Sequence, residues 1–113
     1  MNLAEKNCKD YPKGSPPLSR AEAEALLAQA PGWDLNEFHT EISKTFTFDS
    51  YWAGLGFVNA VAWIAQAQQH HPDIVLLYKK AKVSFSTHSV GGLSENDLIC
   101  AAKVNALIGP GKA

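Results

Sequence analysis

Three of the four histidines in this 113-residue chain fall within one short stretch. His70 and His71 are adjacent and are followed by Pro72, and His88 comes 17 positions after His71. Imidazole titrates near neutral pH, so it can donate or accept a proton without a large change in its pKa. The grouping therefore predicts acid and base catalysis by more than one proton carrier.

The same histidines lack the spacing of a metal site. Two adjacent histidines cannot both face one ion from a regular helix or strand, and neither a histidine four residues on nor a cysteine pair is present. We therefore expect no metal ion. Each part of the group also has a plain structural explanation. His70 and His71 could lie at an exposed helix end, where histidine interacts favourably with the helix dipole, and His88 could be a surface residue of a strand.

Local patterns predict seven elements that must position these residues. They are a helix opened by a capping box at 19–30, strands at 33–38 and 42–48, a helix at 50–69, strands at 74–78 and 82–88, and a helix at 94–107. This order predicts an α+β fold, with a four-stranded antiparallel sheet and helices packed on one face.

The predicted elements place the histidines at their ends. His70 and His71 follow the long helix where Pro72 breaks the backbone, so a loop presents both rings. His88 is expected at the end of the strand at 82–88, on its polar side. Asp97 pairs with Ser94 in a second capping box, and that role alone can explain it.

The long helix has more apolar surface than one small sheet can cover. Trp52 and Trp63 fall with Gly56, Asn59 and Gln66 on the side opposite its main apolar face. This excess should meet a partner subunit or a ligand. The alternative is that the N-terminal arm covers part of this surface, but self-association is the interpretation we favour.

Bulk properties indicate one domain. We expect an extended or mobile arm at 1–17, a folded domain at 18–108 and a short tail at 109–113. Ten basic and eleven acidic residues give a net charge of −1, which argues against nucleic-acid binding. No apolar run is long enough for a membrane span and no secretory leader pattern is present, so we expect a cytosolic protein with Cys8 and Cys100 as reduced thiols.

Three motifs carry a family resemblance: "HHPDIVLLY", "STH" and "GGLSENDL", with "APGW" and "FTF" upstream. Together they closely resemble the pterin-4a-carbinolamine dehydratases, over about residues 18–107. The resemblance implies an enzyme without a cofactor that removes the hydroxyl group from the 4a carbon of a hydroxytetrahydropterin and gives quinonoid dihydropterin. It also implies recycling of the pterin used by aromatic amino acid hydroxylases, and a homodimer or homotetramer.

The resemblance also implies roles for individual residues. His70 and His88 would donate and accept protons, and His71 would orient the pterin or act as a second base. The implied pocket walls are Pro72, Thr87, His88, Ser89 and Val90, supported by Asp97, Gln66 and Trp33. Trp33 borders the site or packs in the core. Gln66 occupies a position that is commonly acidic in the family, and it cannot raise the pKa of a neighbouring histidine by charge. His39 has no counterpart and is expected at the surface.

A binding function is the alternative. The family is also similar to oligomerising cofactors of a homeodomain transcription factor and to relatives that help to assemble RuBisCO in carboxysomes. Such roles would use helix surfaces such as the face of Trp52 and Trp63, and they would not need the histidines. Because all three histidines are present, we favour the enzyme.

Overall fold

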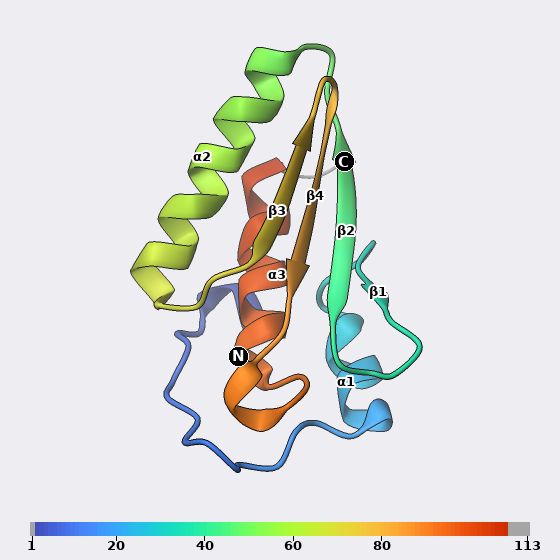
Figure 1. The fold of residues 1–113 in the computed structure, drawn as a ribbon, viewed down its shortest axis with the longest axis vertical. Helices are drawn as coiled ribbons and strands as arrows, with labels where there is room; N and C mark the ends of the chain where they lie inside the picture. Colours follow the sequence, from blue (N-terminus) through green and yellow to red (C-terminus); the bar gives the residue numbers. More distant parts are fainter. Residues whose placement is uncertain (1, 109–113) are drawn as a thin grey trace.

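In a computed structural model, which describes residues 2–108, a four-stranded sheet is covered by helices (Figure 1). The elements are a 3-10 turn η1 (Leu3–Glu5), α1 (Arg20–Leu27), β1 (Asp34–Leu35), β2 (Ile42–Thr47), α2 (Tyr51–Gln68), β3 (Asp73–Leu77), β4 (Lys80–Phe85), a 3-10 turn η2 (His88–Val90) and α3 (Glu95–Ile108). The predicted order of helices and strands is confirmed. The tail expected at 109–113 lies outside the described residues.

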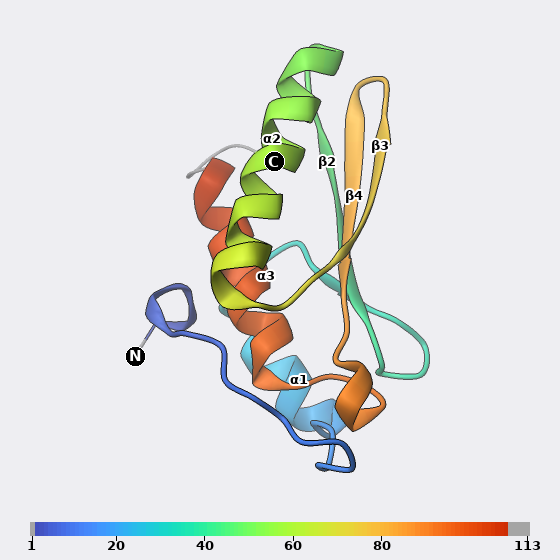
Figure 2. The same cartoon turned by 60° about the vertical axis from the view of Figure 1, so that its left-hand side comes forward.

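The strands pair antiparallel in the order β1-β2-β4-β3. Central to the sheet is the β2–β4 pair, in which Ile42 lies opposite Phe85. Rotated about the vertical axis, the molecule shows α2 and α3 together on one face of the sheet (Figure 2). The predicted fold class, with an open four-stranded sheet and helices on one face, is therefore confirmed.

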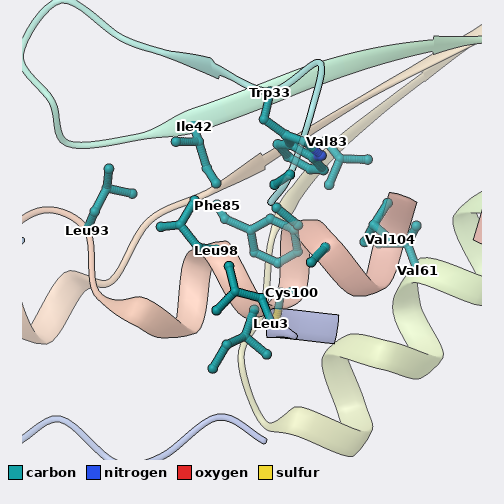
Figure 3. Packing of buried hydrophobic residues seen from close by; sticks show 14 of the residues in the cluster. Leu3, Trp33, Ile42, Val61, Val83, Phe85, Leu93, Leu98, Cys100 and Val104 are labelled. Atoms are coloured by element: carbon teal, nitrogen blue, oxygen red, sulfur yellow. The ribbon is translucent and has the colours of Figure 1, made fainter. Parts of the chain in front are cut away.

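The core lies between that face and the two long helices. Alternate residues of the central strands point into it, as period-two patterning requires, and Ile42, Phe46, Val83 and Phe85 are at most 1% exposed. Side chains of α2 and α3 meet them from the other layer (Figure 3). The buried members drawn there from the helices include Val61, Leu98, Cys100 and Val104.

Both predicted helix starts before the site are confirmed by their caps. Ser19 accepts from the Glu22 amide at 3.1 Å, and the Glu22 carboxylate accepts from the Ser19 amide at 2.8 Å, which completes the capping box. The Ser50 hydroxyl accepts from the Ala53 amide at the start of α2. These local bonds fix where α1 and α2 begin.

The N-terminal arm, expected to be extended or mobile, packs against α3 in the structure. Leu3 is 1% exposed within the core cluster, and Lys103 of α3 donates to the Ala4 carbonyl at 2.9 Å. In Figures 1 and 2 the arm, drawn in blue, runs past the lower ends of α2 and α3. Its contacts are single anchors without a period, so periodicity in the sequence gives no sign of them.

Several predicted boundaries are wrong. The strand expected at 82–88 ends at Phe85, and His88 is instead the first residue of η2. The His88 side chain therefore extends from a turn and not from the polar face of a strand. The strand expected at 33–38 is shorter than predicted and consists of the two residues of β1.

His39, expected at the surface, is half-buried with a φ of 58°, and its Nδ1 atom is buried without a hydrogen-bond partner among the described residues.

The outer side of α2 is open in this single chain. Trp52 and Trp63 are 76% and 73% exposed, as the helical pattern predicts. Within residues 2–108, no helix is both long and apolar enough to cross a bilayer.

Candidate active site

The end of α2 determines where His70 lies. Gln69 adopts the left-handed conformation, with φ 52° and ψ 42°, and the His70 amide donates to the Ala65 carbonyl at 3.1 Å. The chain therefore leaves the helix axis at the first histidine. The imidazole of His70 stacks on the ring of Phe85, with centroids 5.8 Å apart and planes 10° apart.

The buried carboxylate of Asp97 holds the other side of this imidazole. His70 Nε2 lies 2.5 Å from Asp97 Oδ1. The second carboxylate oxygen, Oδ2, accepts from the Thr87 hydroxyl at 2.8 Å and from the Ser94 amide at 2.9 Å. Asp97 is fully buried, so these donors stabilise its charge in place of water.

Asp97 thus does more than the predicted capping box. Its bond to the Ser94 amide is one half of such a box, but the Ser94 hydroxyl bonds to the Thr87 hydroxyl at 2.8 Å instead of capping the helix. Because Thr87 Oγ1 donates to Asp97, the Ser94 hydroxyl is the donor in that pair. The chain after β4 and the start of α3 are thereby joined behind His70.

The pKa of His70 reflects two opposing effects. Burial alone lowers it, since the side chain is only 12% exposed, but the hydrogen bond and the negative charge of Asp97 outweigh burial and raise the pKa above its ordinary value. A carboxylate can only accept, so Nε2 carries a hydrogen atom. No described residue bonds Nδ1, which is therefore the ring atom that can exchange a proton with a ligand.

All three predicted histidines line one open pocket of about 400 Å³. Thr87 and Ser89 form part of its wall, and His71 and His88 are exposed to solvent there. The full lining is Gln69, His70, His71, Pro72, Asp73, Ser86, Thr87, His88 and Ser89. Two short loops, one after α2 and one after β4, thus bring together residues that lie far apart in the sequence.

Three predicted site residues lie away from this pocket. Trp33 is 5% exposed in the core, where it packs on Phe85 and donates through Nε1 to Asn105 Oδ1 at 3.0 Å. Gln66 is exposed on α2 and does not belong to the lining. Val90 is buried and does not belong to the lining.

Sequence reasoning missed the support of the site. Phe85 looks like an ordinary core residue of a strand, and Ser94 like an ordinary cap, yet the first stacks on His70 and the second helps to hold Asp97. A second pocket of about 460 Å³ shares Gln69, His70, Thr87 and Ser89 with the first. Arm residues 7–11 form its outer wall, which no pattern in the sequence indicated. The alternation of Ser84 and Ser86 could have indicated Ser86 as a polar pocket residue.

The donor set suits proton transfer better than metal binding. Among residues 2–108, no three side chains of histidine, cysteine, aspartate or glutamate gather closely enough to hold an ion. One imidazole is held by a buried carboxylate and two more are accessible. This arrangement can deliver a proton at one point of a ligand and accept one at another.

Comparison with known protein families decides the relationship. The model of the family described as pterin 4 alpha carbinolamine dehydratase matches residues 16–107. The chain belongs to this family. The match includes all three pocket histidines, Asp97 and the helices that position them.

Bacterial relatives match over nearly their whole length. A protein of Nitrosomonas eutropha is 48% identical over 108 residues, covering 95% of this chain and 94% of its own. One from Stenotrophomonas maltophilia is 50% identical over 105 residues, covering 93% and 90%. Both are named, provisionally, as pterin-4-alpha-carbinolamine dehydratases.

Solved structures share the fold. A transcriptional coactivator/pterin dehydratase from Brucella melitensis superposes with a TM-score of 0.78 at 30% identity, covering 82% of this chain and 99% of that one. A pterin dehydratase-like protein described as a RuBisCO assembly factor in the alpha-carboxysome has a TM-score of 0.60 at 23% identity, covering 73% and 93%. At that identity the second likeness shows the fold alone.

Proposed function

We propose that this chain converts a 4a-hydroxytetrahydropterin to quinonoid dihydropterin and water by histidine acid and base catalysis. The observation that carries the proposal is the His70–Asp97 pair in the wall of a pocket that His71 and His88 also line. Membership of the pterin carbinolamine dehydratase family supports the substrate class.

The first proton transfer is assigned to His70. Expulsion of the 4a hydroxyl group as hydroxide is unfavourable, whereas a protonated hydroxyl group leaves as water. His70 has a raised pKa because Asp97 stabilises its charged form, so more of it is protonated near neutral pH than of an ordinary histidine. Nδ1 donates this proton to the leaving oxygen as the bond from that oxygen to carbon 4a breaks.

The second proton transfer is assigned to His88. Loss of water leaves a cationic pterin, which becomes neutral when a ring nitrogen loses its proton. His88 lies on the other loop of the pocket and is exposed, so it can accept this proton and release it to solvent. His71 orients the pterin or acts as a second base, while Pro72, Thr87 and Ser89 form walls. The reaction involves no net oxidation or reduction, so the proposal requires no cofactor.

The wider role follows from the substrate. A 4a-hydroxytetrahydropterin is the product released by aromatic amino acid hydroxylases, so we place the enzyme in recycling of their pterin. We also propose that it acts as a homodimer or homotetramer through α2. The 76% and 73% exposure of Trp52 and Trp63 supports this, because tryptophan is costly to leave in water.

Stopped-flow absorbance tests the reaction. Decay of 4a-hydroxytetrahydropterin is followed in buffer, with the unmodified protein, and with His70→Ala and His88→Ala. We expect acceleration by the unmodified protein and loss of most of it, about 100-fold, in each variant. His39→Asn is the matched control, because it removes the histidine outside the pocket and asparagine tolerates a positive φ. Decay at the buffer rate with folded, unmodified protein refutes the proposed activity.

A further inference from the structure

Two cysteines that the proposed reaction does not use lie side by side. Cys8 belongs to the N-terminal arm and Cys100 to α3, yet their Sγ atoms are 3.6 Å apart. Cys100 is fully buried in the core cluster, near Leu3 in Figure 3. Cys8 is half-buried and lines the 460 Å³ pocket that also contains His70.

Hydrogen bonds on both sides hold Cys8 in this position. Its amide donates to Gln68 Oε1 at 2.7 Å. Next to it, the Lys9 amide donates to Asn96 Oδ1 at 3.0 Å, and Asn96 Nδ2 donates back to the Lys9 carbonyl at 2.7 Å. The arm is therefore held to α2 at Cys8 and to α3 at the next residue, Lys9. A disulfide has a sulfur–sulfur distance of about 2.05 Å, so the two sulfur atoms must approach by roughly 1.6 Å for the bond to form.

The two thiols are chemically unequal. The hydrogen bond from Cys100 lowers the pKa of Cys8, although burial partly opposes this effect. The hydrogen bond to Cys8, together with burial, raises the pKa of Cys100. A thiolate is the reactive form of cysteine. The accessible sulfur is thus the one that ionises more readily, and the buried one stays a thiol.

We propose that Cys8 and Cys100 are a modification site at which a hydroperoxide oxidises the pair to a disulfide. The Cys8 thiolate attacks one peroxide oxygen, the O–O bond breaks, and the released hydroxide takes a proton to become water. Cys8 is then a sulfenic acid. The Cys100 sulfur attacks the Cys8 sulfur, the S–O bond breaks, and the departing hydroxide takes the Cys100 proton. In sum, two thiols and one hydrogen peroxide give one disulfide and two waters.

The bond would clamp the arm onto α3. Closing a loop between residues 8 and 100 restricts the unfolded chain strongly, so the oxidised protein should be more stable. The clamp lies beside the His70–Asp97 pair of the proposed site, because Cys100 follows Asp97 by about one turn of α3 and Cys8 shares a pocket with His70.

Mass spectrometry of the full chain tests the proposal. Reduced protein is treated with equimolar hydrogen peroxide, quenched with N-ethylmaleimide in denaturant and digested with trypsin. We expect loss of both alkylation sites and a reducible link between peptides 7–9 and 83–103. We also expect the melting temperature to rise by about 4 °C or more and to return after reduction with dithiothreitol.

Two variants separate the steps. In Cys100→Ala, Cys8 has no partner, so its sulfenic acid should persist and be trapped by dimedone. In Cys8→Ala, the buried Cys100 should resist peroxide and remain alkylable after unfolding. Neither readout depends on pterin turnover, so the two proposals can fail separately.

Three outcomes would overturn the proposal. One is a wild-type Cys8 that proceeds to sulfinic acid as fast as in Cys100→Ala. Another is a link that forms only between chains, as a dimer band on a non-reducing gel. The third is a linked protein whose melting temperature does not rise, which would refute the clamp.

Discussion

His70 Nε2 and Asp97 Oδ1 lie 2.5 Å apart, although 27 positions separate the two residues in the chain. The other carboxylate oxygen is occupied by Thr87 and Ser94, so Asp97 cannot turn away without losing two buried bonds. The carboxylate therefore favours the charged form of His70 and keeps a hydrogen atom on Nε2. This pair links the packing of α3 to the proposed chemistry.

Asp97→Asn should slow dehydration while the fold is retained. The amide can still accept from Thr87 and Ser94 through its oxygen, but it then turns an NH2 group towards His70 Nε2. His70 becomes a neutral ring with its proton on Nδ1. We expect a rate loss on the order of 100-fold by stopped flow, with a lower His70 pKa in an NMR titration.

Glu95→Gln is the matched control for that change. It also removes one negative charge from the first turn of α3, but Glu95 pairs with Lys6 at 3.1 Å and does not touch His70. Its turnover should equal that of the unmodified protein. An Asp97→Asn protein that is folded and turns over within twofold of the unmodified one would contradict the role assigned to Asp97.

Stability should depend on pH through His70. Its folded pKa is raised above the ordinary value of about 6.5, so the charged form binds Asp97 more favourably than it binds water. This stabilisation is complete below the unfolded pKa and is lost as pH rises through the folded pKa. It amounts to about 1.4 kcal/mol for each unit by which the pKa is raised.

Urea unfolding of the unmodified protein and of His70→Gln, from pH 5.5 to pH 8.5 in a reducing buffer, measures this effect. The difference in unfolding free energy between the two proteins should shrink as pH rises, because glutamine does not titrate. Other titrating groups are common to both proteins and cancel in the difference. A difference that stays constant or grows with pH would show that the pKa of His70 is not raised.

The sequence predicted the fold well because local rules and tertiary packing agree. Capping at Ser19 and alternation of Ile42 and Phe46 both favour the elements that form. The predicted end of the strand at 82–88 was wrong because the alternation of inward and outward side chains continues to Thr87, whereas the β4 ladder ends at Phe85. Thr87 is still buried, but it bonds Asp97 and Ser94 and not a neighbouring strand.

The site was predictable only where residue types carry its chemistry. The three histidines share a pocket, as their clustering indicated. The bond between Asp97 and His70 was not predictable from pattern, because the capping position already explained the aspartate. Packing of the arm was hidden for a similar reason, since Leu3 is a single buried anchor in a polar segment.

Phe85→Leu should affect catalysis beyond its cost in stability. Phe85 is 1% exposed and contacts both Trp33 and His70, with centroid distances of 5.7 Å and 5.8 Å. Leucine keeps an apolar contact but removes the flat surface against which the imidazole stacks. We expect the free energy of unfolding, measured with urea, to fall by about 1–2 kcal/mol. Because a small misplacement of a catalytic group is costly, kcat should fall about 10-fold with little change in KM.

Phe46→Leu controls for lost packing. Phe46 is fully buried and also contacts Trp33, but its other ring contact is with Phe57, at a tilt of 44°, and not with His70. The Phe46→Leu variant should lose about as much unfolding free energy as Phe85→Leu but keep the kcat of the unmodified protein. If both variants lose kcat equally, general loosening of the core explains the effect, and stacking on His70 has no special role.

Trp63→Glu should lower the oligomeric state. Trp63 is 73% exposed on α2 in the single chain, so a charge there costs little in a monomer but much in an apolar interface. Light scattering after size exclusion should give a dimer or tetramer mass for the unmodified protein and a smaller mass for the variant. Trp52→Glu, on the same side of the helix, should act in the same direction.

Phe38→Glu is the control for charge at an exposed aromatic position. Phe38 is 75% exposed, and it lies in the turn between β1 and β2 and not on α2. The same substitution there should leave the mass unchanged. If the unmodified protein is already monomeric at micromolar concentration, or if Phe38→Glu dissociates it as fully as Trp63→Glu, α2 is not the surface through which the chain associates.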